Sequence, residues 1–120
     1  MSTVDYRMAR RALLRDLARG RVSRLDVCDA HPELIRAARF IGEELEDVCP
    51  VCEEAPLRAV FYTYGGELRG RENGRVRRMQ DLAELRSAVG DFVCYVVEVC
   101  TECQWNHLVR SFAAGRRHAG

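Results

Sequence analysis

Lysine is absent from this sequence of 120 residues, in which all nineteen basic residues are arginine, and long apolar runs are absent as well. No stretch approaches the roughly 18 apolar residues that a membrane-spanning helix needs. The first residues, MSTVDYRMARRALLRDL, lack the charged, apolar and small-residue regions of a secretory signal peptide. These absences predict a cytoplasmic protein that does not associate with a membrane.

The formal net charge of +1 conceals blocks of opposite sign. Residues 1–24 contain seven arginines and two aspartates, whereas residues 26–56 contain two arginines and nine acidic residues. Residues 69–78 are basic again, with five arginines and one glutamate. A DNA-binding domain usually has a strongly basic balance overall. The pattern therefore favours a partner of mixed charge over plain duplex DNA.

The first third of the chain predicts short helices. Apolar residues recur at helical spacing over residues 5–19, and arginines at every fourth position form a stripe along the same segment: Arg7, Arg11, Arg15 and Arg19. Ser23, with Asp26 three positions later, predicts the start of a second short helix, and Pro32 suits the first turn of a third that ends near Ile41. A helical cap over the rest of the molecule is the preferred interpretation, and a helix-turn-helix is the looser alternative.

After residue 48 the pattern changes to strands. Residues 57–64 are rich in aromatic and β-branched side chains and end at a pair of glycines, which predicts a strand and a turn. Residues 67–75 form a charged loop, residues 76–89 return to helical spacing, and residues 92–99 give the clearest strand pattern in the chain.

Two CxxC pairs carry the strongest chemical signal. CPVC provides Cys49 and Cys52, and CTEC provides Cys100 and Cys103. Two thiolates on one tight turn can reach the same ion, and two such knuckles supply the four sulfur ligands that tetrahedral Zn²⁺ prefers. The 47 residues between the pairs exceed the usual spacing of roughly 15–20, and the predicted helix and loop account for the excess.

These observations predict an α+β fold, in which a cap of short N-terminal helices joins a zinc-ribbon-like antiparallel sheet with a helical insertion between the two knuckles. We expect a helical region over residues 1–45, a zinc-ribbon-like domain over residues 46–112 with the inserted helix at 76–89, and a basic, flexible tail over residues 113–120.

Other chemistry remains open for the cysteines. An iron–sulfur cluster also takes four cysteines, whereas a redox CxxC needs a βαβ context and disulfides are rare in the cytosol. His31 and Glu33, followed by CxxC, match part of the zinc deaminase pattern, although that reading leaves the second knuckle unused. Cys28 and Cys94 are expected to pack as small apolar residues.

The run VDYRMARRALLRDLARGRVSRLDVCDAHPELIRAARFIGE, followed by CPVC and by VVEVCTECQWNHL, resembles a family of short actinobacterial proteins of unknown function. The resemblance extends from about residue 4 to residue 112, and CDAHPEL and CTECQWNHL are its most specific parts. It implies a cytoplasmic, zinc-ribbon-like protein and brings no activity or partner with it. Zinc knuckles often place glycine soon after the second cysteine, whereas Glu53 follows Cys52 here.

The function expected from the sequence is that of a non-catalytic zinc protein without a small-molecule substrate, which binds nucleic acid, RNA polymerase or the ribosome. Arginine suits phosphate because its fork donates two parallel hydrogen bonds. The candidate contacts are Arg7, Arg11, Arg15, Arg19, Arg69, Arg71, Arg75, Trp105 and His107. For the residues, the alternatives are that the arginine stripe is only a solvated helix face and that Trp105 covers the core. For the function, the alternatives are an adaptor that binds only protein and a zinc hydrolase or deaminase.

Overall fold

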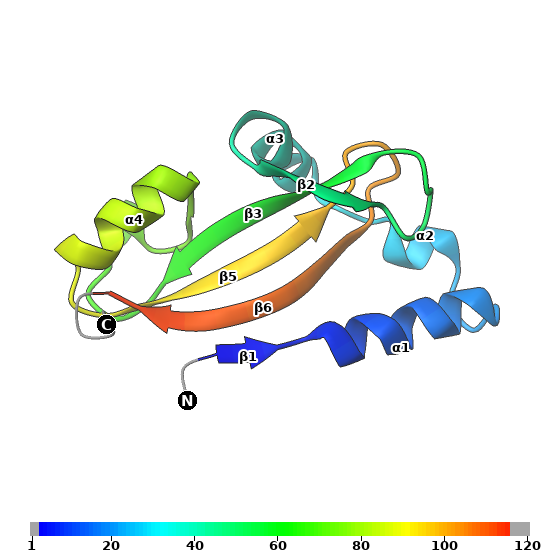
Figure 1. Ribbon diagram of the computed structural model, residues 1–120, viewed down its shortest axis with the longest axis horizontal. Coiled ribbons are helices and arrows are strands. Elements are labelled where there is room, and N and C mark those ends of the chain that lie inside the picture. Colours follow the sequence, from blue (N-terminus) through cyan, green and yellow to red (C-terminus); the bar gives the residue numbers. More distant parts are fainter. Residues whose placement is uncertain (1–2, 116–120) are drawn as a thin grey trace.

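The centre of the computed structural model, which describes residues 3–115, is an antiparallel sheet of six strands (Figure 1). Its strands are β1 (Thr3–Asp5), β2 (Glu43–Val48), β3 (Pro56–Tyr64), β4 (Arg75–Arg77), β5 (Phe92–Val99) and β6 (Asn106–Ala114). The helices are α1 (Arg7–Ala18), α2 (Arg24–Val27), α3 (Pro32–Phe40), α4 (Met79–Ala88) and the short 3-10 helix η1 (Gly70–Glu72). This arrangement confirms the predicted zinc-ribbon-like α+β fold, with a helix between the two CxxC pairs.

The sheet brings the two CxxC pairs together. Its strand order is β1–β6–β5–β3–β2, with β4 paired to β3. One hairpin joins β2 to β3 and another joins β5 to β6, and each turn contains one CxxC pair. Because Arg58 near the start of β3 lies opposite Val99 at the end of β5, both turns lie at the same end of the sheet.

Within residues 3–115, three apolar clusters form the core. Alternate residues of a strand face opposite sides of the sheet, so Val60 packs under α3 whereas Ala59 and Phe61 face α4. The buried members are the α3 cluster (Ala37, Ala38, Val60, Val99), the α4 cluster (Ala59, Phe61, Leu68, Leu82, Phe92, Cys94, Val96, Ala114) and the knuckle cluster (Val27, Cys49, Ala55, Leu57, Cys100, Trp105). Leucines of α1 cover the knuckle cluster.

The short helices begin where the sequence predicts. Ser23 and Asp26 form a reciprocal capping box at the start of α2. His31 is the N-cap of α3, where its Nδ1 accepts a hydrogen bond of 3.1 Å from the backbone N–H of Glu33, and Pro32 occupies the first turn. The HPE triplet therefore serves as a helix start in this structure.

The sequence predicts β3 and β5, whereas β1, β2, β4 and β6 were not predicted. The segment 1–45, expected to be helical, contains β1 and part of β2 in addition to α1, α2 and α3. The sequence of β2, EELEDV, hides its strand character because an edge strand can carry charge on both faces and needs few apolar side chains. The predicted boundary at residue 45 thus falls inside a strand that pairs with β3.

Smaller differences occur later in the chain. The helix expected over residues 76–89 begins at Met79, because residues 75–77 pair with β3 as β4. The tail expected over residues 113–120 begins within β6, which extends to Ala114, and residues 116–120 lie outside the described part of the chain. Among the helices of residues 3–115, none has the length and apolar character required to cross a membrane.

Candidate metal centre

The two CxxC turns are folded in the same way. In the first, the backbone N–H of Cys49 donates to the carbonyl of Ala55 at 2.8 Å, and the N–H of Glu53 donates to the carbonyl of Cys49 at 3.0 Å. In the second, Cys100 donates to Trp105 at 2.8 Å and Gln104 donates to Cys100 at 3.0 Å. Two segments far apart in sequence have therefore formed matching knuckles.

Each knuckle requires one residue in the left-handed region. Glu53, with φ of 57°, and Gln104, with φ of 73°, directly follow the second cysteine of their knuckles. They are the two non-glycine residues with positive φ in the described part of the chain. Such a conformation is uncommon without glycine and is retained where the surroundings determine it. The absence of glycine after Cys52 therefore does not prevent the knuckle from forming.

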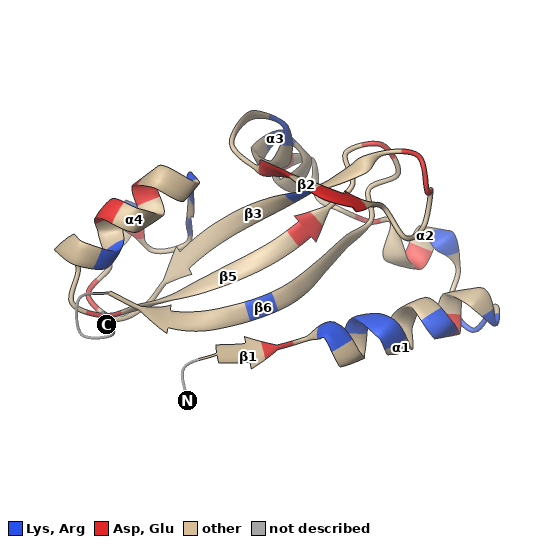
Figure 2. Ribbon diagram, in the orientation of Figure 1, with Lys and Arg blue, Asp and Glu red and all other residues tan. Residues whose placement is uncertain are grey.

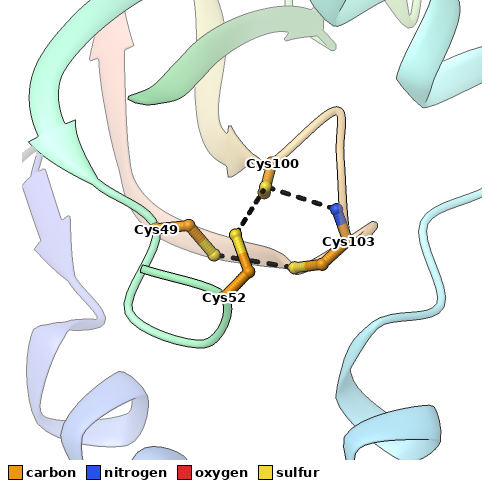
Figure 3. A group of neighbouring side chains, drawn as sticks. All are labelled: Cys49, Cys52, Cys100 and Cys103. Carbon is orange, nitrogen blue, oxygen red and sulfur yellow. Dashed lines mark hydrogen bonds between the residues drawn. The ribbon is translucent and has the colours of Figure 1, made fainter. Parts of the chain in front are cut away.

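The four cysteine sulfurs gather at the end of the sheet. All of them lie within 4.8 Å of one another, and they come from both hairpin turns (Figure 3). The Sγ atoms of Cys49 and Cys103 are 3.6 Å apart, and those of Cys52 and Cys100 are 3.7 Å apart. Four sulfurs at about 2.3 Å from a single tetrahedral ion would be separated by about 3.8 Å. The four cysteines thus form a group that can hold a metal ion.

The electrostatics of the group also suit a cation. Cys49 and Cys100 are buried, and burial is the main cause that raises the pKa of each thiol. Partial burial of Cys52 opposes its ionisation, but backbone N–H groups of the first knuckle outweigh this and lower its pKa to about 7. Backbone amides also donate to Cys49 and Cys100, at 3.4 Å in each case. Thiolates packed this closely need a positive charge among them.

Trp105 lies in the core, which excludes the predicted direct contact with a base or partner in this conformation. Its exposed fraction is 0%, and it belongs to the knuckle cluster. Its indole Nε1 donates a hydrogen bond of 2.7 Å to Glu98. The alternative prediction, that Trp105 covers the core beside the cysteines, is the arrangement observed. His107 is partly exposed and stacks against Trp105, with 5.8 Å between ring centroids.

The predicted arginine contacts all lie on the surface. The stripe on α1 is exposed at each of its four positions: Arg7, Arg11, Arg15 and Arg19. Figure 2 shows this basic helix along one side of the molecule and acidic residues along β2 and the turn that follows it. Arg69, Arg71 and Arg75 are exposed too, but Arg69 donates to carbonyls of its own loop and Arg75 pairs with Glu72 at 2.9 Å.

A partly buried charge network beside the knuckles was not predicted from the sequence. Glu98 is only 6% exposed and accepts hydrogen bonds from Trp105 and from Nε of Arg10, the latter at 2.8 Å. A signal was present, because Glu98 interrupts the alternating buried face that begins with Phe92 in β5, and Arg10 lies between the apolar positions of α1. A carboxylate on the buried face of a strand predicts a basic partner nearby.

The remaining cysteines and His31 lie outside the group of four. Cys94 is fully buried in the α4 cluster, as its place in the strand predicted. Cys28 packs against the knuckle cluster as expected, but its Sγ also lies 3.7 Å from that of Cys103. No local pattern in the sequence indicates this contact, since the two cysteines are 75 positions apart.

The fold and the cysteine group together define the class of protein: a zinc-ribbon-like α+β protein with a group of four cysteines able to bind a metal ion. The whole chain, residues 1–120, matches the model of a family of unknown function, DUF5318. The chain belongs to this family, which confirms the resemblance noted from the sequence.

Two mycobacterial relatives illustrate the family. The uncharacterized protein Rv0049 of Mycobacterium tuberculosis (strain H37Rv) is 40% identical to this chain over 112 residues, which is 93% of the chain and 81% of the relative. The uncharacterized protein Mb0050 of Mycobacterium bovis has the same identity and coverage. No solved structure matches the chain.

Proposed function

We propose that the protein binds one Zn²⁺ through Cys49, Cys52, Cys100 and Cys103, and that the ion has a structural role. The observation that carries this proposal is the meeting of four sulfurs within 4.8 Å of one another, with cross-knuckle distances that suit a single ion. A multi-iron cluster would require room for inorganic sulfide between the cysteines. Four sulfur ligands complete a tetrahedral site and leave no open position for water or substrate, so the ion would not be a catalytic centre. We propose on this basis that the protein is not an enzyme.

The ion would join the two hairpins and, through them, the helical cap. The first knuckle connects β2 to β3 and the second connects β5 to β6. Side chains of α1 and Val27 of α2 pack on the cluster that contains Cys49 and Cys100. Because metal binding and folding are coupled at such sites, the ion would fix the cap on the sheet.

Metal analysis of protein purified under reducing conditions tests this proposal. We expect one zinc per chain and a colourless sample, whereas iron would give visible absorption bands. Replacement by Co²⁺ should give the spectrum of a tetrahedral ion with four sulfur ligands. A spectrum with an oxygen ligand would instead support the hydrolase or deaminase alternative, and a metal-free folded chain would overturn the proposal.

We further propose that the exposed arginines of α1 bind nucleic acid or an assembly that contains it, such as RNA polymerase or the ribosome, in the cytoplasm. Within the described residues, Arg11, Arg15 and Arg19 are exposed and form no ion pair, so their guanidinium groups are free for phosphate. Arg7 differs, because it pairs with Asp5 at 2.6 Å.

An adaptor that binds only protein is the second candidate, and the acidic residues of β2 favour it. Glu44, Glu46 and Asp47 are exposed on this edge strand, which would repel a phosphate backbone. Electrophoretic mobility with duplex DNA and structured RNA over a series of salt concentrations separates the two candidates. Binding to nucleic acid should weaken steeply with salt because counterions are released, and the absence of any shift at low salt would favour the adaptor.

A further inference from the structure

Cys28 is a fifth thiol held against the proposed metal site. It is the C-cap residue of α2, and its thiol donates a hydrogen bond of 3.7 Å to the sulfur of Cys103. This separation equals the 3.7 Å between Cys52 and Cys100 across the two knuckles. Cys28 therefore lies as close to one proposed ligand as the ligands lie to each other.

Contacts on either side of Cys28 fix its position. The backbone N–H of Ala30 donates to the carbonyl of Gln104 at 3.0 Å, and the side-chain amide of Asn106 donates to Asp29 at 3.0 Å. Gln104, which accepts the first of these hydrogen bonds, and Asn106, which donates the second, both follow Cys103 closely in the sequence. The segment between α2 and α3 is thus docked on the second knuckle, and the backbone that carries Cys28 is held beside Cys103.

Cys28 is surplus to the coordination of the ion. A tetrahedral site needs four thiolates, and the group that lies within 4.8 Å contains four cysteines without Cys28. Cys28 and Cys103 are both partly exposed, whereas Cys49 and Cys100 are buried. The fifth thiol therefore adjoins the site on a side that a small solute can reach.

We propose that Cys28 and Cys103 form a hydroperoxide-responsive thiol pair that regulates the metal centre, an inference that rests on the proposed metal-binding function. A metal-binding thiolate next to a free thiol matches the arrangement in which one cysteine is oxidised and a neighbour resolves the product. Cys49 lies equally near to Cys103, with 3.6 Å between their Sγ atoms. However, Cys49 is itself a proposed metal ligand, whereas Cys28 is not.

The reaction balances with a hydroperoxide as the oxidant. The thiolate of Cys103 attacks the terminal peroxide oxygen, the O–O bond breaks, and Cys103 becomes a sulfenic acid. The alkoxide or hydroxide that leaves takes up a proton from solvent and becomes an alcohol or water. The Cys28 sulfur then attacks the Cys103 sulfur, the S–O bond breaks, and the hydroxyl leaves as water together with the proton of the Cys28 thiol. Two electrons pass from the two thiols to the peroxide. The sulfurs, 3.7 Å apart, must approach by about 1.6 Å to form a disulfide.

Two consequences follow for the molecule. Cys103 can no longer act as a thiolate ligand, so three of the four proposed ligands remain and the metal is released. The disulfide also protects the Cys103 sulfur from further oxidation to sulfinic acid, which thiol reductants do not reverse. A reductant should therefore restore metal binding in the native sequence.

The experiment starts from the full chain loaded with zinc, and its zinc content before oxidation tests the metal proposal separately. The protein is treated with hydrogen peroxide, released zinc is followed with a chromophoric chelator, and disulfides are mapped by mass spectrometry of peptides. The reductant and fresh zinc are then added, and the metal content is measured again. Cys28→Ser is compared with Cys94→Ala, because Cys94 is buried in the α4 cluster away from the knuckles.

We expect the native chain and Cys94→Ala to form a disulfide between Cys28 and Cys103, to release zinc and to regain one zinc per chain after reduction. Cys28→Ser should bind one zinc at the outset but regain less than about half of it, because its Cys103 proceeds to sulfinic acid. A native chain that instead joins Cys103 to Cys49 or Cys100 would overturn the inference, as would full recovery of Cys28→Ser. A chain without zinc at the start would overturn the metal proposal, and the disulfide map would still test the thiol pair.

Discussion

The two ends of the sheet are stabilised by different means. At the α4 end, the α4 cluster contains large apolar side chains such as Phe61, Leu82 and Phe92, and only one cysteine. At the knuckle end, two of the six buried residues of the knuckle cluster are proposed metal ligands. In the same cluster, Trp105 donates a hydrogen bond to the buried carboxylate of Glu98. One end is an ordinary apolar core, whereas the other depends on cysteine sulfurs, a partly buried ion pair and, in our proposal, an ion.

The difference indicates which contacts would survive the loss of metal. The strands themselves continue through both ends, since β3 pairs with β5 from Arg58 to Tyr64. The helices differ, because α4 packs on its own apolar cluster while α1 and α2 pack on the cluster that contains the cysteines. We therefore expect removal of metal to loosen α1 and α2 and to leave α4 in place.

The largest effect is expected from Cys49→Ser. It removes a buried ligand, and loss of a structural metal is among the few changes that cost more than about 4 kcal/mol in the free energy of unfolding. Metal analysis should show loss of zinc. Relative to the native chain, amide hydrogen exchange should become faster in α1 and α2 but not in α4. Cys28→Ser is the matched control and should keep its zinc. An unchanged zinc content in Cys49→Ser would remove Cys49 from the ligand set.

A second prediction concerns the opposite end. Leu82 is 5% exposed in the α4 cluster, and truncation of a buried leucine to alanine costs about 2–5 kcal/mol. Leu82→Ala should therefore lower the free energy of unfolding, measured with a chemical denaturant, by this amount. Its zinc content should stay at one per chain. A loss of zinc in Leu82→Ala would show that the two ends are not independent.

The same comparison explains what the sequence could predict. The strand of residues 92–99 was predicted with the bounds that β5 has, because apolar side chains alternate along it and a helix end and a cysteine pair limit it. The group of four cysteines was predicted because each CxxC is a local motif, and the fold had only to bring two motifs together. Local patterns of this kind depend on few other residues.

The contacts that were not predicted depend on pairing between distant segments. Glu43–Val48 is a strand because β3 supplies its partner, and its acidic sequence gives no strand pattern by itself. The approach of Cys28 to Cys103 depends on hydrogen bonds between the α2–α3 segment and the second knuckle. The local sequence allows Trp105 to be either exposed or buried. In the structure it is buried in the knuckle cluster, where it donates a hydrogen bond to Glu98, a residue seven positions earlier on β5.

Trp105→Phe tests the charge network at the knuckle end, with a smaller effect. It keeps most of the apolar volume but removes the hydrogen bond of 2.7 Å to Glu98, and a hydrogen bond to a charged group contributes about 1.5–3 kcal/mol. We expect a decrease of this size in the free energy of unfolding, with zinc retained. Tyr62→Phe is the control, since Tyr62 forms no side-chain hydrogen bond within residues 3–115 that would be lost. Equal effects of the two variants would contradict a stabilising role for the Trp105–Glu98 bond.

The smallest effect on stability, and the test of the α1 surface, is expected from Arg11→Glu combined with Arg15→Glu. Both side chains are exposed and form no ion pair among the described residues, so the free energy of unfolding should change by no more than about 0.5 kcal/mol. Binding to structured RNA or DNA at low salt should weaken strongly, because two phosphate contacts become repulsive. Arg36→Glu combined with Arg86→Glu changes the net charge equally on other helices and should weaken binding less. If both double variants bind nucleic acid equally, the affinity depends only on the net charge of the protein, and the arginines of α1 do not form a specific contact surface.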